Sequence, residues 1–512
     1  MMRQSWNPLY ALAGGSSLVV ALLILLLPTG RQPFSSVGPS ADKLFLYCAA
    51  GLRAPTERVA RQYEQEYGVQ VDLQYGGSNT LLSQIEVGGV GDLYLAADAA
   101  YIELAQQKQL AREAIPVATM HPVVAVAVGN PKGIHGIADL WRDDVAVALA
   151  NPDQAAVGKL LRNQLTATRQ WQLLRDAVRK RGVFKPTVGD VANDVKLGSV
   201  DAGVLWDAVA AQYPELETVV CGELNDGQVN IEIAVLSSTK QPTAALHFAR
   251  YLAAQDRGLE TFGELGYEPV DGDPWEHRPE LTLFAGVVNR RALEPIVEGF
   301  AAREGADVVT VYNGCGILTA QMKTLEADAS DGFPDAFMAC DTHYMDVVSD
   351  FFPEPANVSN TRIVMVVEKG NPKRILRLED LAKPGVRLAL GQPQQCTIGV
   401  LSRRLLEHVG LYERLLNANV VTQTTSSALL IPSVLTGGAD VALVYETDVQ
   451  AERERLGVIP IESELAKAVQ PFGVAAGSNH RRLSRRLLDA IGRSQDQFEA
   501  AGFNWLYDDL AP

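Results

Sequence analysis

The sequence predicts an α/β protein that contains two copies of one domain, and three observations lead to this prediction. Apolar strands alternate with amphipathic helices along the chain, a pattern typical of α/β sheets. A passage that begins at Lys43 returns in the same order of elements from Glu280. At 512 residues, the chain is long enough for two or three domains that each bury their own core.

The repeat is visible in the order of its motifs. The first copy begins LFLYCAAGLRAPTERVARQYEQEYGVQVDLQYGGSNTLLSQI, and the second begins LTLFAGVVNRRALEPIVEGFAAREGADVVTVYNGCGILTAQM. Three later pairs follow in the same order: GDLYLAADAAYIEL with PDAFMACDTHYMDV, VALANPDQAAVGKLLRNQL with LALGQPQQCTIGVLSRRLL, and GSVDAGVLWDAV with GGADVALVYETD. Because this order is colinear over nearly the whole of both halves, we infer a tandem duplication.

Each copy is predicted to consist of two lobes. A strongly apolar strand precedes a Gly-Asn-Pro turn near the middle of each copy, and another apolar strand comes late. At these two places the chain would pass from one lobe to the other and back, so the two lobes would be joined by a hinge and would enclose a cleft. The alternation of strands and helices predicts a parallel sheet in each copy. The predicted segments are a cytoplasmic N-terminus (1–8), a transmembrane or signal helix (9–28), a linker (29–42), a first domain (43–270), a linker (271–280) and a second domain (281–512).

The segment 9–28 carries no charged residue. About twenty apolar or small residues are enough to cross the hydrocarbon core of a membrane. The segment is either an uncleaved anchor, which we favour, or a cleaved signal peptide, since its most apolar part is short. In both cases the domains are expected on the extracytoplasmic side, attached to the inner membrane if the anchor is retained.

The charge of the chain argues against one class of partner. The formal net charge is −16, and no basic patch stands out. Proteins that bind nucleic acid need a positive surface to neutralise phosphates. We therefore expect no nucleic-acid partner.

The motifs resemble those of type II periplasmic binding proteins, specifically the molybdate-binding branch. The resemblance rests on the AAGL turn, GGSNTLLSQIEVGGVGDLYLAADAAYI, the NPDQAAVG turn and VDAGVLW in the first copy, and it covers about 230 residues per copy. It implies two tandem domains, each with two α/β lobes that close on an oxyanion such as molybdate, tungstate or sulfate. Such receptors usually serve an ABC permease, and no cofactor is expected.

Glycine-rich turns that open helices suit an anion independently of any family. They direct unpaired backbone N–H groups and the positive end of a helix dipole at one point. The resemblance places the ligand-binding positions of copy one at Gly51, Ser78, Val157, Val188 and Trp206. Ser78 would donate its hydroxyl, or serve only as a helix N-cap. The family has a serine and a tyrosine where this chain has Gly51 and Trp206, so copy one would lose two hydroxyl contacts.

In copy two the matching positions are Val288, Cys315, Ile398, Ser427 and Tyr445. Two further cysteines, Cys340 and Cys396, replace alanines of copy one at equivalent turns. We expect the three thiols of Cys315, Cys340 and Cys396 to converge on one cavity. They would bind a soft metal ion or another thiophilic ligand, form a disulfide between Cys315 and Cys340 or Cys396, or remain inert.

An enzyme is the least favoured reading. A hypothetical catalytic group would consist of Cys315, Asp341 and His343. The sequence contains no nucleophile motif such as G-x-S-x-G to support it. We expect Asp98 and Asp341 to cap helices or hold turns. A receptor that signals through a partner protein without transport stays an alternative to the importer receptor.

Overall fold

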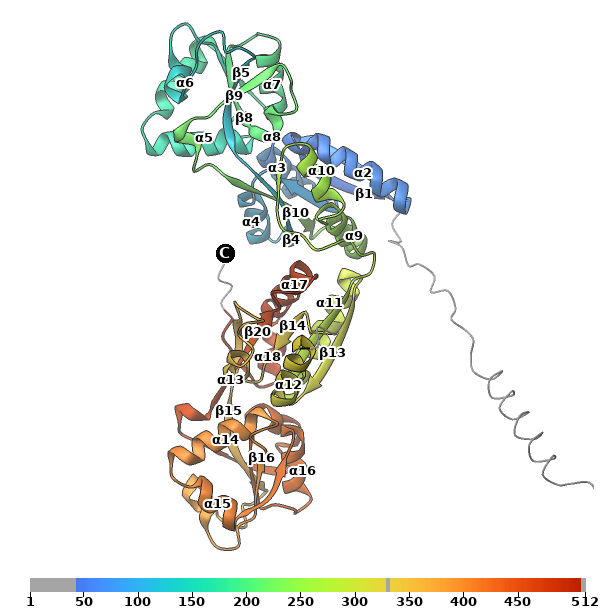
Figure 1. Ribbon diagram of the computed structural model, residues 1–512, viewed down its shortest axis with the longest axis vertical. Coiled ribbons are helices and arrows are strands. Elements are labelled where there is room, and N and C mark those ends of the chain that lie inside the picture. Colours follow the sequence, from blue (N-terminus) through green and yellow to red (C-terminus); the bar gives the residue numbers. More distant parts are fainter. Residues whose placement is uncertain (1–42, 328–331, 508–512) are drawn as a thin grey trace, which may run out of the picture. The chain divides into compact units, whose positions relative to one another are not determined.

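The computed structural model describes residues 43–327 and 332–507 (Figure 1). The segment predicted to cross the membrane, 9–28, lies outside these residues. Within the described ranges, no helix is both long enough and apolar enough to span a bilayer.

Lobe one of copy one is built on a six-stranded sheet in the order β11–β4–β10–β3–β1–β2. Its strands are β1 (Lys43–Ala49), β2 (Gln70–Gly76), β3 (Leu93–Ala96), β4 (Ala111–Met120), β10 (Val229–Leu236) and β11 (Glu268–Pro269). Its helices are η1 (Ala50–Leu52), α2 (Arg53–Tyr67), α3 (Ser78–Gly88), α4 (Ala100–Gln107), α9 (Pro242–Leu252) and α10 (Gly258–Glu264).

Lobe two of copy one has a five-stranded sheet in the order β7–β6–β8–β5–β9 (Figure 1). Its strands are β5 (Pro122–Ala127), β6 (Val147–Ala150), β7 (Val183–Lys185), β8 (Ala202–Trp206) and β9 (Leu216–Val219). Its helices are η2 (Ile137–Trp141), α5 (Ala156–Ala167), α6 (Trp171–Arg181), α7 (Val188–Lys196), α8 (Asp207–Ala210) and η3 (Gly222–Leu224).

Copy two repeats this plan on a ten-stranded sheet that runs through both of its lobes. Lobe one contains β12 (Glu280–Gly286), β13 (Asp307–Asn313), β14 (Ala336–Met338), β20 (Lys467–Val474) and β21 (Asn504–Trp505), with η4 (Val287–Asn289), α11 (Arg290–Glu304), α12 (Cys315–Ala327), α13 (Thr342–Asp346), α17 (Arg481–Gly492) and α18 (Gln495–Ala500). Lobe two contains β16 (Leu388–Gly391), β17 (Val420–Thr424), β18 (Val441–Tyr445) and β19 (Leu456–Pro460), with η5 (Leu378–Ala382), α14 (Thr397–His408), α15 (Tyr412–Ala418), η6 (Ser427–Leu429), α16 (Leu430–Leu435), η7 (Glu446–Glu452) and η8 (Glu464–Ala466).

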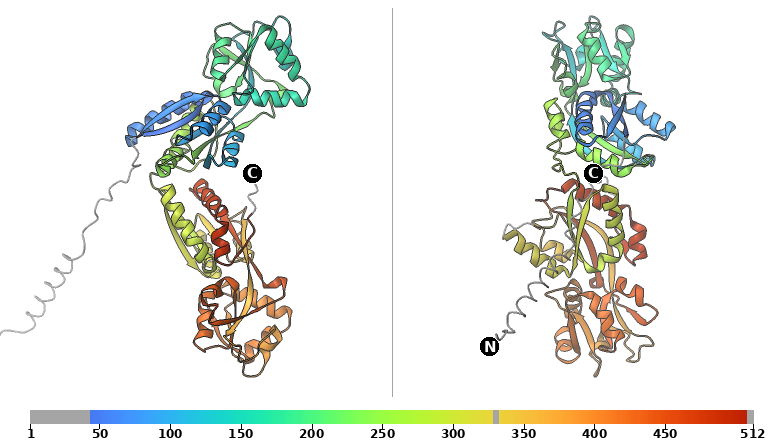
Figure 2. Two further views of the ribbon diagram at one scale, coloured as in Figure 1. Left: turned by 180° about the vertical axis from the view of Figure 1, so that it is seen from behind. Right: turned by 90° about the vertical axis from the view of Figure 1, so that its right-hand side faces the viewer.

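The connection between lobes differs between the copies. In copy one the chain passes from β4 of one sheet to β5 of the other with only His121 between them. In copy two a single strand, β15 (Ala356–Glu368), pairs with β20 through its first half and with β18 through its second half. Figure 2 shows the two lobes of each copy from two further sides. The predicted two-lobe plan is confirmed.

The sheets are mixed, so the expectation of a parallel sheet in each copy was wrong. β1 runs parallel to β2 and β3, whereas β10 runs antiparallel to β3 and β4. The reason is that β10 brings the chain back from lobe two and enters the sheet from the opposite end. β20 does the same in copy two, where it pairs antiparallel with β14.

Three strands of each copy are buried along their whole length. Every residue of β3, β6 and β8 is buried, as is every residue of the equivalent β14, β16 and β18. Strands buried on both faces read as continuous apolar runs, because helices cover both sides of the sheet. The turns that follow these strands are therefore held on a rigid support.

Candidate ligand cleft

A small cavity lies between the two lobes of copy one. Its volume is about 10 Å³, room for roughly one water molecule. Lobe one contributes the ends of β1 and β2 and the start of α3, and lobe two contributes the starts of α5 and α7 and the end of β8. Four of the predicted positions line it: Gly51, Ser78, Val188 and Trp206. Val157 does not, and the preceding residue, Ala156, takes its place.

Ser78 is the first residue of α3, and its side chain is buried. Its hydroxyl oxygen accepts a hydrogen bond from the N–H of Ala97, at 3.2 Å. The N-cap position belongs to Gly77, so the reading of Ser78 as an N-cap was wrong. The hydroxyl proton of Ser78 is left to be donated to a ligand.

Two of the three predicted backbone donors belong to residues that line this cavity, Ser78 and Val188, and the third, Val157, directly follows Ala156 of the lining. Ser78, Val157 and Val188 stand in the first turns of α3, α5 and α7, where N–H groups have no partner inside their own helix. Throughout the described ranges, none of these three N–H groups finds an acceptor in the protein. The positive ends of three helices, from both lobes, therefore supply free donors to one place.

Trp206 occupies the space next to Gly51. A Cβ atom placed on Gly51 would lie 3.3 Å from Val209, 3.5 Å from the ring of Trp206 and 3.7 Å from Val188. The indole of Trp206 is fully buried, and its Nε1 has no partner among the described residues. Trp206 thus both packs against the first turn and holds an unused donor.

The lobes of copy one touch across the cleft. The N–H of Asn79 donates to the carbonyl of Gln154 at 3.1 Å, and the amide of Asn79 donates to the carbonyl of Asp153 at 2.8 Å. A Cβ atom on Gly77 would stand 2.3 Å from that Gln154 oxygen, so only glycine permits this approach. Copy one is in a closed conformation.

Copy two keeps the backbone donors and changes the side chains. Val288, Cys315, Ile398, Ser427 and Tyr445 are all buried. Cys315 and Ile398 stand in the first turns of α12 and α14, and Ser427 opens η6. Their N–H groups, like those of copy one, find no protein acceptor in the part of the chain that the structure describes.

The lobes of copy two also meet, through different residues. Cβ atoms on Gly314 and Gly316 would lie 2.5 Å and 2.9 Å from the carbonyls of Gln395 and Gln394. Gly316 stands where copy one has Asn79, and the hydroxyl of Tyr344 instead donates to the carbonyl of Pro393 at 3.4 Å.

Two of the three predicted thiols meet. The sulfur atoms of Cys315 and Cys340 are 2.8 Å apart, and the N–H of Cys340 donates to the sulfur of Cys315 at 3.1 Å. The thiol of Cys396 instead contacts the carbonyls of Gln392 and Thr424, each at 3.6 Å. All five cysteines are free thiols.

No group of three or more His, Cys, Asp or Glu residues in 43–327 and 332–507 is arranged to hold a metal ion. The three thiols therefore do not form a metal-binding cluster within these residues. Cys315 and Cys340 both belong to lobe one, whereas Cys396 is the N-cap of α14 in lobe two and turns toward carbonyls beside it.

The two paired thiols differ in acidity. Burial alone would raise the pKa of Cys315, but the thiol and N–H of Cys340 and the Thr397 hydroxyl outweigh it and lower the pKa. The contact with Cys315, together with burial, raises the pKa of Cys340 well above its usual range. Cys315 is thus the more acidic of the two thiols.

Unused polar groups surround the copy-two cleft. Within the described residues, the hydroxyl of Tyr445 is buried without a hydrogen-bond partner. Burial raises the pKa of Asp448 to about 7, although the nearby Ser427 hydroxyl works in the opposite direction. One oxygen of the Asp448 carboxyl, Oδ2, is buried and also lacks a partner there.

Comparison with known proteins identifies the family. Residues 44–268 and 281–504 both match the family described as bacterial extracellular solute-binding protein. The chain belongs to this family.

The solute-binding chain is similar to proteins with a named ligand. The molybdate-binding protein ModA of Mycobacterium tuberculosis H37Rv is 30% identical over 248 residues, which are 47% of this chain and 92% of that protein. ModA of Escherichia coli K12 is 24% identical over 225 residues, 41% of this chain and 83% of that protein. The solved structure of the Azotobacter vinelandii periplasmic molybdate-binding protein has 18% identity and a TM-score of 0.40, covering 44% of this chain and 100% of that chain.

Membership of a solute-binding family confirms the prediction that the chain is a binding protein and not an enzyme. The residues of the catalytic alternative are also used otherwise. Asp341 caps α13 by accepting the backbone N–H of His343, at 3.0 Å, and its second oxygen accepts the N–H of Val469. The side chain of His343 is exposed. Asp98 likewise accepts the N–H of Ala100, so the expected structural roles of both carboxylates are confirmed.

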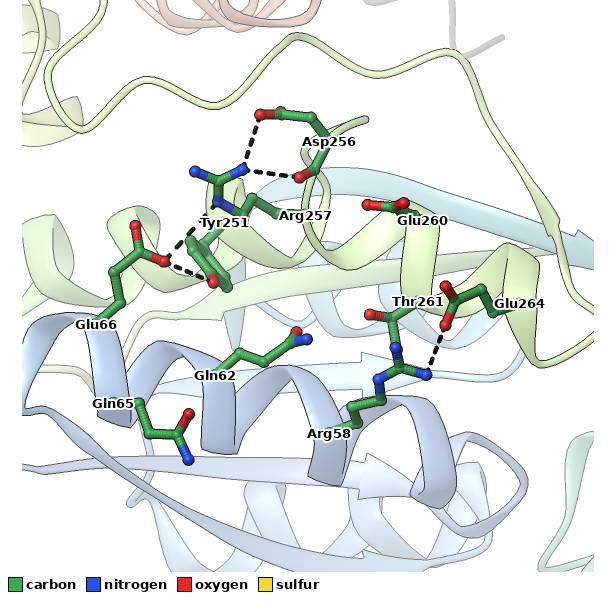
Figure 3. A pocket seen from close by; sticks show the side chains of 10 residues that line it. All are labelled: Arg58, Gln62, Gln65, Glu66, Tyr251, Asp256, Arg257, Glu260, Thr261 and Glu264. Atoms are coloured by element: carbon green, nitrogen blue, oxygen red, sulfur yellow. Dashed lines mark hydrogen bonds and ion pairs between the residues drawn. The ribbon is translucent and has the colours of Figure 1, made fainter.

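A larger groove of this solute-binding protein, about 430 Å³, lies between α2 and α10 (Figure 3). Its polar side chains pair with one another: Arg58 with Glu264, Arg257 with Asp256 and Tyr251 with Glu66. It lies away from the strand ends that form the interlobe cavity. Paired charges of both signs do not select an anion.

Sequence reasoning missed Asn79, Tyr344 and Asp448. Asn79 directly follows Ser78 in the glycine-rich turn, so a polar residue at the tip of that turn was the available signal. Tyr344 and Asp448 stand in the repeated motifs, at the positions of Tyr101 and Val209 of copy one, but the sequence pattern does not show that either side chain reaches the cleft.

Proposed function

We propose that the chain captures a small tetrahedral oxyanion in the interlobe cleft of copy one, with molybdate, tungstate and sulfate as the candidates. The observation that carries the proposal is the set of three free N–H groups, at Ser78, Val157 and Val188. They come from both lobes, so an anion that binds all three favours the closed conformation. Neutral donors at helix ends can hold an anion without a cation.

The side chains of copy one tune this preference. The Ser78 hydroxyl and the Trp206 Nε1 are the side-chain donors available to a ligand. Gly51 supplies no hydroxyl, and its neighbours fill the space a side chain would need. We expect weaker binding than in a relative with two more hydroxyls, since each such contact is worth about 1 kcal/mol. The similarity to ModA proteins makes molybdate the first ion to test.

Copy two offers the same backbone donors at Cys315, Ile398 and Ser427, with the unused hydroxyl of Tyr445. A thiophilic ligand is the alternative for this copy, with the Cys315–Cys340 pair as its sulfur donors. The separation of Cys396 argues against a three-thiol metal site. We therefore propose an oxyanion for copy two as well, with a preference altered by the thiols.

The role that we propose for this receptor is delivery of the anion to an ABC permease. Residues 9–28 would hold the receptor at the inner membrane. A receptor that signals without transport is the alternative. Uptake distinguishes them, because loss of the receptor would abolish anion accumulation only in the first case.

Native mass spectrometry of the full-length chain with molybdate, tungstate, sulfate and Cu(I) tests the ligand class. We expect the oxyanions, and not Cu(I), to add in stoichiometric amounts. Addition of Cu(I) alone would replace the proposal by the thiophilic alternative. Absence of any adduct at millimolar anion would reject it.

A further inference from the structure

We propose that Cys315 and Cys340 form a reversible disulfide whose formation removes negative charge from the wall of the copy-two cleft. The two sulfur atoms are already in contact at 2.8 Å, and both belong to the same lobe. No movement of one lobe against the other is needed to join them. The consequence for anions rests on the proposed function, whereas the disulfide itself does not.

Copy two is adapted to hold two sulfur atoms here. A Cβ atom on Gly286 would lie 2.1 Å from the sulfur of Cys340 and 2.8 Å from that of Cys315. The equivalent position in copy one is Ala49, and the positions of the two cysteines are Ala97 and Ser78. The methyl group is thus absent in the copy where the two thiols stand together.

Cys315 accepts the same backbone hydrogen bond as Ser78, with a sulfur atom in place of the hydroxyl oxygen. The N–H of Ala97 donates to the Ser78 oxygen, and the N–H of Cys340 donates to the Cys315 sulfur. The sulfur of Cys315 also lies 2.8 Å from that of Cys340, whose thiol lowers the pKa of Cys315. Both contacts favour a thiolate, because hydrogen bonds to a charged form stabilise it. Copy two then presents an ionisable thiol where copy one presents a neutral hydroxyl.

The two thiols divide the roles that thiol–disulfide exchange requires. Cys315 is the more acidic and attacks as the thiolate, and Cys340 resolves the intermediate. An external disulfide such as oxidised glutathione is the oxidant. Attack by Cys315 forms a mixed disulfide and releases one glutathione; Cys340 then displaces the second glutathione. The Cys315 and Cys340 sulfurs are oxidised and one glutathione disulfide is reduced to two thiols, which take up one proton from Cys340 and one from solvent because Cys315 reacts as the thiolate.

Access to the pair depends on the cleft. Cys315 is 0% exposed and Cys340 is 5% exposed. Thr397, from lobe two, lies against both. An external reagent therefore reaches the thiols only when the lobes of copy two separate. A family that works outside the cytoplasm meets oxidising conditions in which such a pair can close.

The experiment equilibrates the full-length chain with reduced or oxidised glutathione and then blocks free thiols. Peptide mapping reads the disulfide, and native mass spectrometry counts bound molybdate. We expect a Cys315–Cys340 disulfide in the oxidised chain and a second molybdate whose affinity is at least about tenfold weaker in the reduced chain, since a nearby negative charge opposes the anion.

Variants that restore the residues of copy one sharpen the test. Cys315→Ser removes the charge, so the second molybdate binds equally in both buffers. Cys340→Ala leaves Cys315 without its resolving partner, so a glutathione adduct accumulates at Cys315. Cys396→Ala still forms the Cys315–Cys340 disulfide. Cys48→Ala, in the core of copy one, is the control that changes a cysteine without changing the pair.

Failure to map the Cys315–Cys340 disulfide, or pairing of Cys315 with Cys396, overturns the proposal. A mapped disulfide with the same second molybdate affinity in both buffers overturns its effect on the cleft. If neither copy binds any anion, the proposed function and the effect on the cleft fail together, and the redox site is upheld or rejected by the peptide map alone.

Discussion

The side-chain amide of Asn79 donates a hydrogen bond of 2.8 Å to the backbone carbonyl of Asp153. Asn79 belongs to α3 of lobe one and Asp153 to the turn before α5 of lobe two. The bond therefore exists only when copy one is closed. Under the proposed function we expect it to contribute to ligand affinity without touching the ligand, because any contact made only in the closed state favours binding.

Asn79→Ala is predicted to weaken molybdate binding by copy one about fivefold, since one hydrogen bond is worth about 1 kcal/mol. Titration calorimetry of the full-length chain measures the change. Gln84→Ala, at an exposed position on the same helix, is the matched control. An equal loss in both variants would mean that the amide of Asn79 does not act through closure.

Ser78→Ala removes one of the two side-chain donors that copy one offers beside its backbone N–H groups. We expect about a fivefold to thirtyfold loss of affinity in copy one, since a hydrogen bond to a charged group is worth about 1.5 to 3 kcal/mol and part of it can be replaced by water. Ser83→Ala, whose hydroxyl donates to the carbonyl of Asn79 at an exposed site, should bind as the parent does. The same calorimetric titration decides, and unchanged binding by Ser78→Ala would exclude its hydroxyl from the site.

The buried carboxyl of Asp448 should make the free energy of unfolding depend on pH. Burial raises the pKa of Asp448 to about 7, so between its ordinary pKa of 3.8 and that value the folded chain binds more protons than the unfolded chain. The free energy of unfolding therefore falls as the pH rises through this window, and stays low above it.

Asp448→Asn should remove this decline, which amounts to a few kcal/mol at most because one pKa unit is worth about 1.4 kcal/mol. Urea unfolding at pH 5 and pH 8 measures the difference between the variant and the parent. The exposed Asp346→Asn provides the control. A parent and an Asp448→Asn variant with the same pH slope would show that the carboxyl is charged throughout.

The presence of two similar domains could be predicted because each strand, helix and turn of the first copy occurs again, in the same order, in the second. The matching turns of the two copies predict that four residues face one cleft, since ligands of open α/β sheets bind at the carboxyl ends of the strands. These residues are Gly51, Ser78, Val188 and Trp206. The antiparallel course of β10 could not be predicted, because an apolar run such as VNIEIAVL has the same pattern in either direction.

The direction of the side chains was the second feature that the sequence could not predict. The sequence places Cys315, Cys340 and Cys396 at three neighbouring turns, but it does not say which thiols face each other. The chain approaches the cleft from lobe one at Cys315 and Cys340 and from lobe two at Cys396. The contact of the first two depends on the missing methyl of Gly286, which has meaning only once the strands are in place.

Closure around an anion is most directly tested by placing a methyl group where the lobes meet. A Cβ atom on Gly77 would lie 2.3 Å from the carbonyl oxygen of Gln154, and one on Gly314 would lie 2.5 Å from that of Gln395. Gly136→Ala and Gly477→Ala are the controls, since a Cβ atom at either meets nothing within 4 Å.

Calorimetric titration of the full-length Gly77→Ala/Gly314→Ala chain with molybdate is the deciding measurement, with urea unfolding of the same sample to verify its fold. We predict that this folded chain loses molybdate binding by at least about a hundredfold, because a clash of this kind costs several kcal/mol in the closed state alone. The double control should titrate as the parent does. Parent-like affinity in the Gly77→Ala/Gly314→Ala chain would contradict closure of the lobes around the ligand.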